Sequence, residues 1–463
     1  MRPIRYLIIL AALASAGAAR ADDSPDVDAA TQQRIERLER DLRELKKDTR
    51  KIEVANEETA KLRPLAGYDD KGFFIQTSDG ANRLSVGGYV HFDGRYFLNS
   101  GDGGTSTFLL RRARIDLRGK LFKYFDYKFM TDFAGGQTVI QDAYISANYV
   151  PWFRIQAGKY KAPVGLERLQ SANALMFVER ALPTNLVPNR DLGFMAWGLP
   201  FYGALEYQLA ILDGVVDGGS LNNDTDPNDD KLFAGRFFVL PFKDRPIEFL
   251  RGFGIGLSGT YGEQKGSLSA PQTPQYRSDG QQVFFRYVTN SPATGAGTVV
   301  AHGPQSRISP QGYWYWGPAG FLWEWVQSEN TYRLGTVERE ITASSWQTQF
   351  SYVVTGETNG YRGITPAKNF DPWKFLDGYW GAVEVAGRYA QLEVDKAVYS
   401  LGFANPNNAA REAKAWGIGV NWYLAKSVRV MLDYYSTEFT GGAPNGGNRD
   451  DEDLLNSRVQ FVF

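Results

Sequence analysis

Four basic residues share one face of a strand-like segment, FLLRRARIDLRGK, within residues 107–121. Arg112, Arg114, Arg118 and Lys120 are separated by even numbers of residues. In a β-strand they therefore project from one side, about 6.6 Å apart for every two residues. Guanidinium groups carry permanent charge and forked donors that suit phosphate oxygens. A row of them would give several moderate anion sites along a path, as conduction requires.

Basic residues of neighbouring segments could extend this row, namely Lys128, Arg154, Lys159, Lys161, Arg236, Arg286 and Arg388. The same face also holds nine carboxylates, at Asp93, Asp116, Asp126, Asp132, Asp142, Glu206, Glu324, Glu384 and Asp433. A structural lattice of paired charges would produce the same pattern. Beyond residue 65 there are 38 basic and 40 acidic side chains, so composition leaves both an anion path and a structural lattice open.

The composition argues against several other functions. The 463 residues include 51 Lys and Arg against 52 Asp and Glu, no Cys and two His. Disulfides and thiolate chemistry are therefore excluded, and near-zero net charge argues against nucleic-acid binding. His91 and Asp93 could form an acid/base pair, but no nucleophile motif accompanies them. We expect no enzyme activity, no cofactor and no metal site.

The elements that must position these residues are β-strands. From Leu84 onward apolar and polar residues alternate, and tight turns alternate with longer loops, which is typical of a membrane barrel. The sequence thus predicts an all-β protein, a transmembrane antiparallel β-barrel of about 16 strands. Its strands are expected near residues 84–96, 107–121, 123–133, 138–150, 152–160, 191–198, 203–213, 231–240, 251–263, 307–317, 320–329, 339–354, 379–395, 411–424, 427–439 and 453–463.

Two segments precede the barrel expected at residues 66–463. Residues 1–21 combine a basic start, an apolar run and an A-x-A cleavage site, which predicts a secretory signal peptide. Residues 22–65 are expected to form a periplasmic helix and linker. The apolar a/d seam of this helix predicts a coiled coil, but the seam does not itself select a dimer or a trimer. A solvated linker helix is the alternative. The apolar seam consists of Ile35, Leu38, Leu42, Leu45 and Ile52.

Three connections are longer than a hairpin needs: residues 161–190, 264–306 and 355–378. Long segments in a barrel either cap it or fold inward and narrow the bore. We expect these three to fold inward.

Several stretches resemble the phosphate- and polyphosphate-selective outer-membrane porins of the porin O and porin P family. They are FLLRRARIDLRG, YKFMTDF, IQDAYI, GKYKAPVGLERLQS, LPTNLVPNRD, SDGQQVFFRY and ISPQGYWYWGP. The resemblance implies a homotrimer of sixteen-stranded barrels in the bacterial outer membrane, with an arginine ladder leading to lysines at a constriction. It places at this path Arg111, Arg112, Arg114, Lys128, Asp142, Lys159 and Lys161.

One position departs from the family pattern. Members known for phosphate selection have an aromatic residue after the RRA motif, where this chain has Arg114. This change could widen the choice of anion or favour larger polyanions.

The sequence therefore predicts a porin for passive uptake of phosphate, related oxyanions or polyphosphate. Two alternatives stay open. In one, the protein is a general or weakly selective porin whose lumen charges are structural. In the other, it is an outer-membrane tether that acts on a periplasmic partner through the helix.

Overall fold

The computed structural model describes residues 25–99, 104–221, 229–290 and 297–463. The signal peptide predicted at 1–21 lies outside this range. The chain divides into two units, one up to Pro64 and one from Leu65 to Phe463.

The first unit contains one long helix, α2 (Pro25–Leu62). The five seam residues named above are between 50% and 71% exposed, so among the described residues of this unit their apolar side chains are not covered. Pairs such as Arg43–Glu39, 3.5 Å apart, follow the helix at a spacing of four residues. Among the described residues, no helix is long and apolar enough to cross a membrane.

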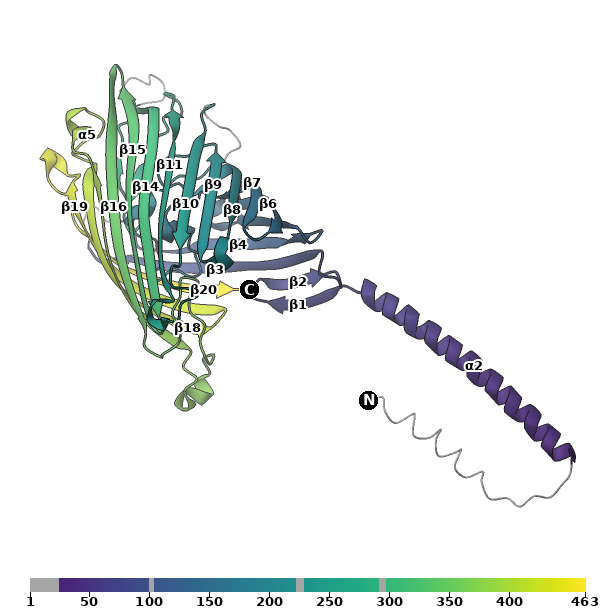
Figure 1. The fold of residues 1–463 in the computed structure, drawn as a ribbon. Coiled ribbons are helices and arrows are strands. Elements are labelled where there is room, and N and C mark those ends of the chain that lie inside the picture. The colour runs from purple at the N-terminus through teal and green to yellow at the C-terminus, as the bar shows by residue number, and fades with distance from the viewer. Residues whose placement is uncertain (1–24, 100–103, 222–228, 291–296) are drawn as a thin grey trace. The chain divides into compact units, whose positions relative to one another are not determined.

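The second unit is a closed antiparallel barrel of sixteen strands (Figure 1). They are β3 (Arg83–Phe97), β4 (Thr107–Leu121), β5 (Phe125–Asp132), β6 (Val139–Val150), β7 (Phe153–Lys161), β8 (Arg190–Gly198), β9 (Leu205–Leu212), β10 (Leu232–Val239), β11 (Phe253–Lys265), β14 (Val300–Trp316), β15 (Ala319–Leu334), β16 (Val337–Val353), β17 (Ala382–Val394), β18 (Ala410–Ala425), β19 (Val428–Gly441) and β20 (Glu452–Val462). The sixteen-stranded barrel predicted from alternation is confirmed, with small shifts of strand ends.

The barrel closes where β20 pairs with β3, in a register that runs from Leu454↔Phe97 to Val462↔Tyr89. The first part of β3 instead pairs with β2 (Gly72–Gln76), which forms a hairpin with β1 (Leu65–Asp69). This hairpin was not predicted from the sequence. β14 begins at Val300, seven residues before its predicted start at residue 307.

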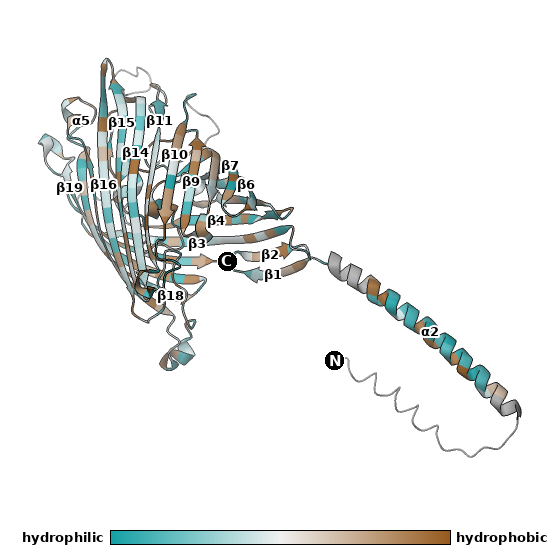
Figure 2. Ribbon diagram, viewed as in Figure 1, coloured by the Kyte–Doolittle hydropathy of each residue, from teal (hydrophilic) through white to brown (hydrophobic). Residues whose placement is uncertain are grey.

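The barrel has the opposite burial pattern to a soluble protein. Inward side chains such as His91 and Asp93 are buried, whereas the outward Phe92 between them is 48% exposed. Phe194, Phe237 and Ile418 on other strands are likewise half exposed or more. Figure 2 shows apolar residues recurring along the strands. Because apolar side chains face outward, the outer surface is suited to lipid.

The connection between β7 and β8 crosses the interior of the barrel. It contains α3 (Leu166–Leu169) and a 3₁₀ turn, η2 (Leu182–Asn185). The Leu166 N–H donates to Glu324 of β15 over 2.7 Å, and the Val178 N–H donates to Asp433 of β19 over 2.6 Å. Gly165 has a φ of 80°, in the left-handed region, and a Cβ there would lie 3.0 Å from Val187 and 3.1 Å from Glu324, so this position favours glycine.

The connection between β11 and β14 also contributes to the interior. Its hairpin, β12 (Gln275–Arg277) with β13 (Val283–Arg286), buries Phe284 and Phe285 completely. The Tyr276 hydroxyl donates to Asp217 over 3.0 Å, and Asp279 is paired with Arg388 of β17.

Only part of the connection between β16 and β17 folds into the barrel. The Tyr361 hydroxyl reaches the interior and donates to the Leu166 carbonyl over 2.6 Å. In η4 (Pro372–Asp377), by contrast, Trp373 is 93% and Leu376 96% exposed. Proline at the first turn and the Asp371 side-chain cap hold this helical turn locally, outside the bore. The remaining short elements are η1 (Ala134–Gly136), α4 (Pro200–Gly203), η3 (Glu248–Leu250), α5 (Ala397–Ser400) and η5 (Pro444–Gly446).

Candidate functional site: a basic cavity in the lumen

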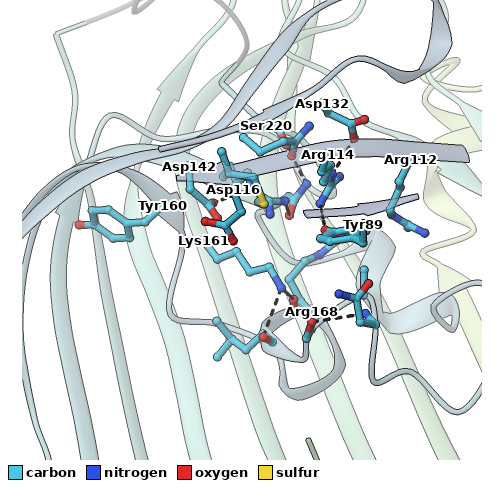
Figure 3. Close-up of a pocket in the computed structure, with 18 of the residues that line it drawn as sticks. Tyr89, Arg112, Arg114, Asp116, Asp132, Asp142, Tyr160, Lys161, Arg168 and Ser220 are labelled. Atoms are coloured by element: carbon cyan, nitrogen blue, oxygen red, sulfur yellow. Dashed lines mark hydrogen bonds and ion pairs between the residues drawn. The ribbon is translucent and has the colours of Figure 1, made fainter. Parts of the chain in front are cut away.

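A cavity of ≈ 1000 Å³ lies between strands β3 to β9 and the connection 161–190 (Figure 3). Its lining is rich in cations, although the whole chain carries a net charge of −1. Eleven basic side chains of the described residues line it: Lys71, Arg111, Arg112, Arg114, Arg118, Lys128, Lys161, Arg168, Arg180, Arg190 and Arg277. Five acidic side chains of the same described ranges line it: Asp70, Asp116, Asp132, Asp142 and Glu179. The excess of six positive charges is local, so it attracts anions to this part of the lumen.

A β-bulge brings two consecutive arginines into the cavity. In the pairing of β3 with β4, Arg112 lies opposite His91 and Leu110 lies opposite Phe92. Arg111 is therefore an extra residue without a partner in the register, and a bulge re-aims side chains in this way. Both Arg111 and Arg112 line the cavity. Strict alternation would have turned Arg111 outward.

Further along β4, each cation has an acidic partner. The Arg114 Nε donates to Asp132 over 2.7 Å, and one Nη donates to the Tyr89 hydroxyl over 2.7 Å. Arg118 pairs with Asp116. These pairs fix the positions of the guanidinium groups and cancel part of their charge.

Asp142 on β6 joins two cations from different elements. Lys128 Nζ lies 2.7 Å from it, and Arg190 Nε lies 2.9 Å from it on its other oxygen. Asp142 thus holds Lys128 and Arg190 in position at the cavity wall.

Three cations of the crossing connection lie against backbone carbonyls instead. Lys161 Nζ donates to the carbonyls of residues 168, 169 and 170, over 2.8, 3.2 and 2.9 Å. Arg180 donates to the carbonyls of residues 167 and 170, over 3.0 and 2.8 Å, and Arg168 donates to that of Thr184. Carbonyls orient these groups without bringing an acidic side chain into contact with them. Burial, then the nearby Arg180 and Arg190, lower the pKa of Arg168 to about 9, so it stays charged at neutral pH.

Glu179, at the centre of the arginine-rich end, is shared by several cations. Its oxygens lie 2.5 Å from Arg111, 3.0 Å from Arg95, and 3.9 Å from both Arg112 and Arg458. Burial opposes ionisation, but Arg111 and Arg112 outweigh it and hold the pKa of the Glu179 carboxyl well below its usual range.

Of the twelve residues proposed from the sequence, seven line the cavity: Arg111, Arg112, Arg114, Arg118, Lys128, Asp142 and Lys161. Five lie elsewhere. Lys120 is 3.9 Å from Asp126, Arg154 lies over the Trp197 ring, and Arg236 is 3.3 Å from Glu206. Lys159 is buried in β7, and Arg286 is exposed on β13.

Five basic residues of the lining were not predicted from the sequence: Arg168, Arg180, Arg190, Arg277 and Lys71. The first two lie between strands, where alternation gives no information about direction. Their only signal was the Glu-Arg pairs at 167–168 and 179–180, of which only the first lies within a motif that resembles the family.

The suggested acid/base pair of His91 and Asp93 does not form. Asp93 accepts two bonds of 2.7 Å from Arg458. The His91 ring lies 2.9 Å from the Asn173 amide oxygen and 3.2 Å from Arg112.

A closed sixteen-stranded barrel with an apolar outer face, a polar interior and a connection folded into the bore defines an outer-membrane porin. A family model described as phosphate-selective porin O and P matches residues 85–463. The chain belongs to this family of outer-membrane channels.

Individual relatives agree with this assignment. Porin O of Pseudomonas aeruginosa is 24% identical over 430 residues, which cover 85% of this chain and 91% of that protein. The outer-membrane channel DcaP of Acinetobacter baumannii has a similar fold, with a TM-score of 0.52 and 10% identity over 84% of this chain and 99% of that one. An anion-selective porin from Comamonas acidovorans gives a TM-score of 0.50 and 11% identity, over 82% and 99%.

Proposed function

We propose that this porin conducts phosphate and related oxyanions, including short polyphosphates, down their gradient through the basic cavity. The observation that carries the proposal is the excess of cations in the cavity lining, together with the three cations that lie against carbonyls. Porin O, the Pseudomonas aeruginosa relative, belongs to a family described as phosphate-selective, which supports the same conclusion.

The arrangement fits a path of exchangeable sites. An anion that leaves bulk water needs donors to replace its hydration, and guanidinium forks supply them in pairs. Arg111 and Arg112 lie at one part of the lining, and Arg168 and Arg180 lie on the crossing connection. Because no single group need hold the anion alone, each site can release it to the next, which permits conduction.

Arg114, which departs from the family pattern, adds less than a full positive charge to the cavity. Its guanidinium is bonded to Asp132 and to the Tyr89 hydroxyl. We infer that it widens the range of accepted anions through shape and donor number more than through charge.

A planar bilayer experiment tests the proposal. Purified protein is placed in a chloride gradient, and inorganic phosphate is then added to symmetric chloride. We expect a reversal potential on the anion side and chloride current that is blocked by low concentrations of phosphate. Weakly selective current that phosphate does not alter would contradict the proposal.

The pairs Arg118–Asp116, Lys128–Asp142 and Arg190–Asp142 favour a second candidate, a general porin whose charges brace the lumen. In that case neutralising Arg168 and Arg180 would leave the reversal potential unchanged, whereas it moves if these two cations face the permeating anion.

We also propose that the protein assembles into a homotrimer, as the family resemblance implies, and that α2 takes part in this association. The exposed seam of this helix supports association with copies of itself, since an isolated apolar stripe gains stability only when it is covered. A periplasmic partner, in the tether alternative, would cover the same seam. Deleting residues 22–65 separates a channel from a tether: a channel keeps its conductance without these residues, whereas a tether loses its attachment to the partner.

A further inference from the structure

The arginines around Glu179 form an oxyanion site that the protein fills with its own carboxylate. Arg95, Arg111, Arg112 and Arg458 all lie within 4 Å of the Glu179 oxygens. They come from β3, β4 and β20, whereas Glu179 comes from the crossing connection.

The charges in this cluster do not balance. Asp93 is the second carboxylate, and its two oxygens each accept a bond of 2.7 Å from Arg458. Four guanidinium groups therefore face two carboxylates, which leaves two positive charges in excess. Arg95 Nε is buried and has no hydrogen-bond partner among the residues that the structure describes. A dianion with several oxygens would complete this site better than one carboxylate does.

The backbone on both sides of Glu179 is fixed independently of its carboxylate. The Val178 N–H donates to Asp433 over 2.6 Å, and the Val178 carbonyl accepts from Arg458 over 2.7 Å. The Glu179 carbonyl accepts from Arg388 over 2.9 Å, and the Ala181 N–H donates to Glu167 over 2.9 Å. The carboxylate can therefore leave the arginines by side-chain rotation alone, while the connection stays in place.

The Glu179 side chain also has space into which it can rotate, because it lines the cavity together with Arg111 and Arg112. Its carboxylate and an incoming anion would compete for the same donors at the cavity wall. Neither would be held permanently, since each is displaced by the other.

We propose that Glu179 is a tethered competitor that occupies the arginine site between passages of a phosphate-like dianion and sets how tightly this porin retains its cargo. This inference rests on the proposed function. It assigns to an acidic residue the role of keeping a strongly basic site exchangeable, because a permanently vacant four-arginine site would trap the anion it is meant to pass.

The test compares phosphate block of chloride current in the full-length protein and in Glu179→Gln. Glutamine keeps the shape but removes the charge, so the concentration of inorganic phosphate for half-block should fall about tenfold. The dwell time of each blocking event should lengthen in proportion. Glu179→Asp keeps the charge on a shorter side chain and should lie between the two, and it serves if the glutamine variant does not fold.

Asp132→Asn is the matched control. Asp132 lines the same cavity and carries the same charge, but it pairs with a single arginine, Arg114. We expect its half-blocking concentration to change less than threefold. Equal shifts in both variants would show a general charge effect and overturn the inference.

The outcomes separate this inference from the proposed function. If the wild-type channel lacks anion preference in a chloride gradient, the proposed function fails. If the wild type prefers anions and is blocked by phosphate, but Glu179→Gln is blocked at the same concentration, only the tethered competitor is refuted.

Discussion

The two faces of the crossing connection use charge in opposite ways. Towards β15 and β19 it presents backbone N–H groups, which Glu324 and Asp433 of the barrel wall accept; Glu324 alone receives those of Leu166 and Glu167. Towards β4 and β6 it presents the side chains of Arg168 and Arg180. Acids on one wall anchor the segment, and bases on the other line the cavity.

This separation explains how a chain of nearly zero net charge can contain a basic path. A count over the whole sequence mixes anchoring acids with lining cations. Buried carboxylates that accept backbone N–H groups hold the segment in place but add little to the field in the cavity on its far side. The local excess decides anion preference.

Neutralising the cavity face should have the greatest effect on selectivity. In Arg168→Gln with Arg180→Gln, we expect the anion-over-cation permeability ratio to fall about tenfold, because two charges without carboxylate partners are lost. Glutamine can still donate to the carbonyls that these arginines bond. Reversal potentials in a potassium chloride gradient provide the measurement. Arg236→Gln is the control, since Arg236 lies beside Glu206 outside the cavity.

The cations of the strand wall should matter less than those of the connection. Arg112→Ala with Lys128→Ala should weaken the anion preference about threefold, since Lys128 is already bonded to Asp142. The same reversal-potential measurement applies. An unchanged potential would show that the strand cations only brace the lumen.

Removing an acid that anchors the crossing connection should disturb the structural order of this connection more than it changes the anion selectivity of the channel. Glu324→Ala leaves the buried Leu166 and Glu167 N–H groups without acceptors, at a cost of about 1–3 kcal/mol for each unsatisfied group. We expect lower thermal stability and more frequent current fluctuations, with selectivity changed less than twofold. Glu324→Gln retains one acceptor oxygen and should recover most of the stability. Steady current in the alanine variant would argue against this anchor.

Deleting residues 22–65 should leave single-channel conductance and selectivity unchanged. The exposed seam of α2 belongs to the other unit, so the effect should fall on assembly. Chemical cross-linking of native membranes measures it: we expect fewer cross-linked oligomers. Altered selectivity would contradict the division of roles between the two units.

The alternation of apolar and polar residues predicted the strands because side chains in a β-strand point alternately into the barrel and out of it. β4 was predicted at residues 107–121 and is found there. The bulge at Arg111 could not be predicted from alternation, because one extra residue changes no residue type and only turns a side chain. The family resemblance placed Arg111 at the path where periodicity did not.

The cations on the connection were harder to find for a different reason. Arg168 and Arg180 point into the cavity because Glu324 and Asp433 hold the backbone from the other side. Glu324 lies 158 positions after Leu166 in the sequence, and Asp433 lies 255 positions after Val178. Direction inside the bore is therefore a property of the assembled barrel and not of the local segment.

The seam between β3 and β20 has a consequence for folding. Arg458 reaches Asp93 across 365 positions of the chain, so nothing along the seam can form until almost the whole barrel has been made. Contacts at such separation are slow to form, because the entropy of closing the loop must be overcome first. Before closure, β3 and β20 are unpaired edges that can pair with strands of another chain. Closure of this one seam is thus the step at which a growing sheet becomes a finished channel, and a chain that lacks β20 would remain an open sheet prone to aggregation.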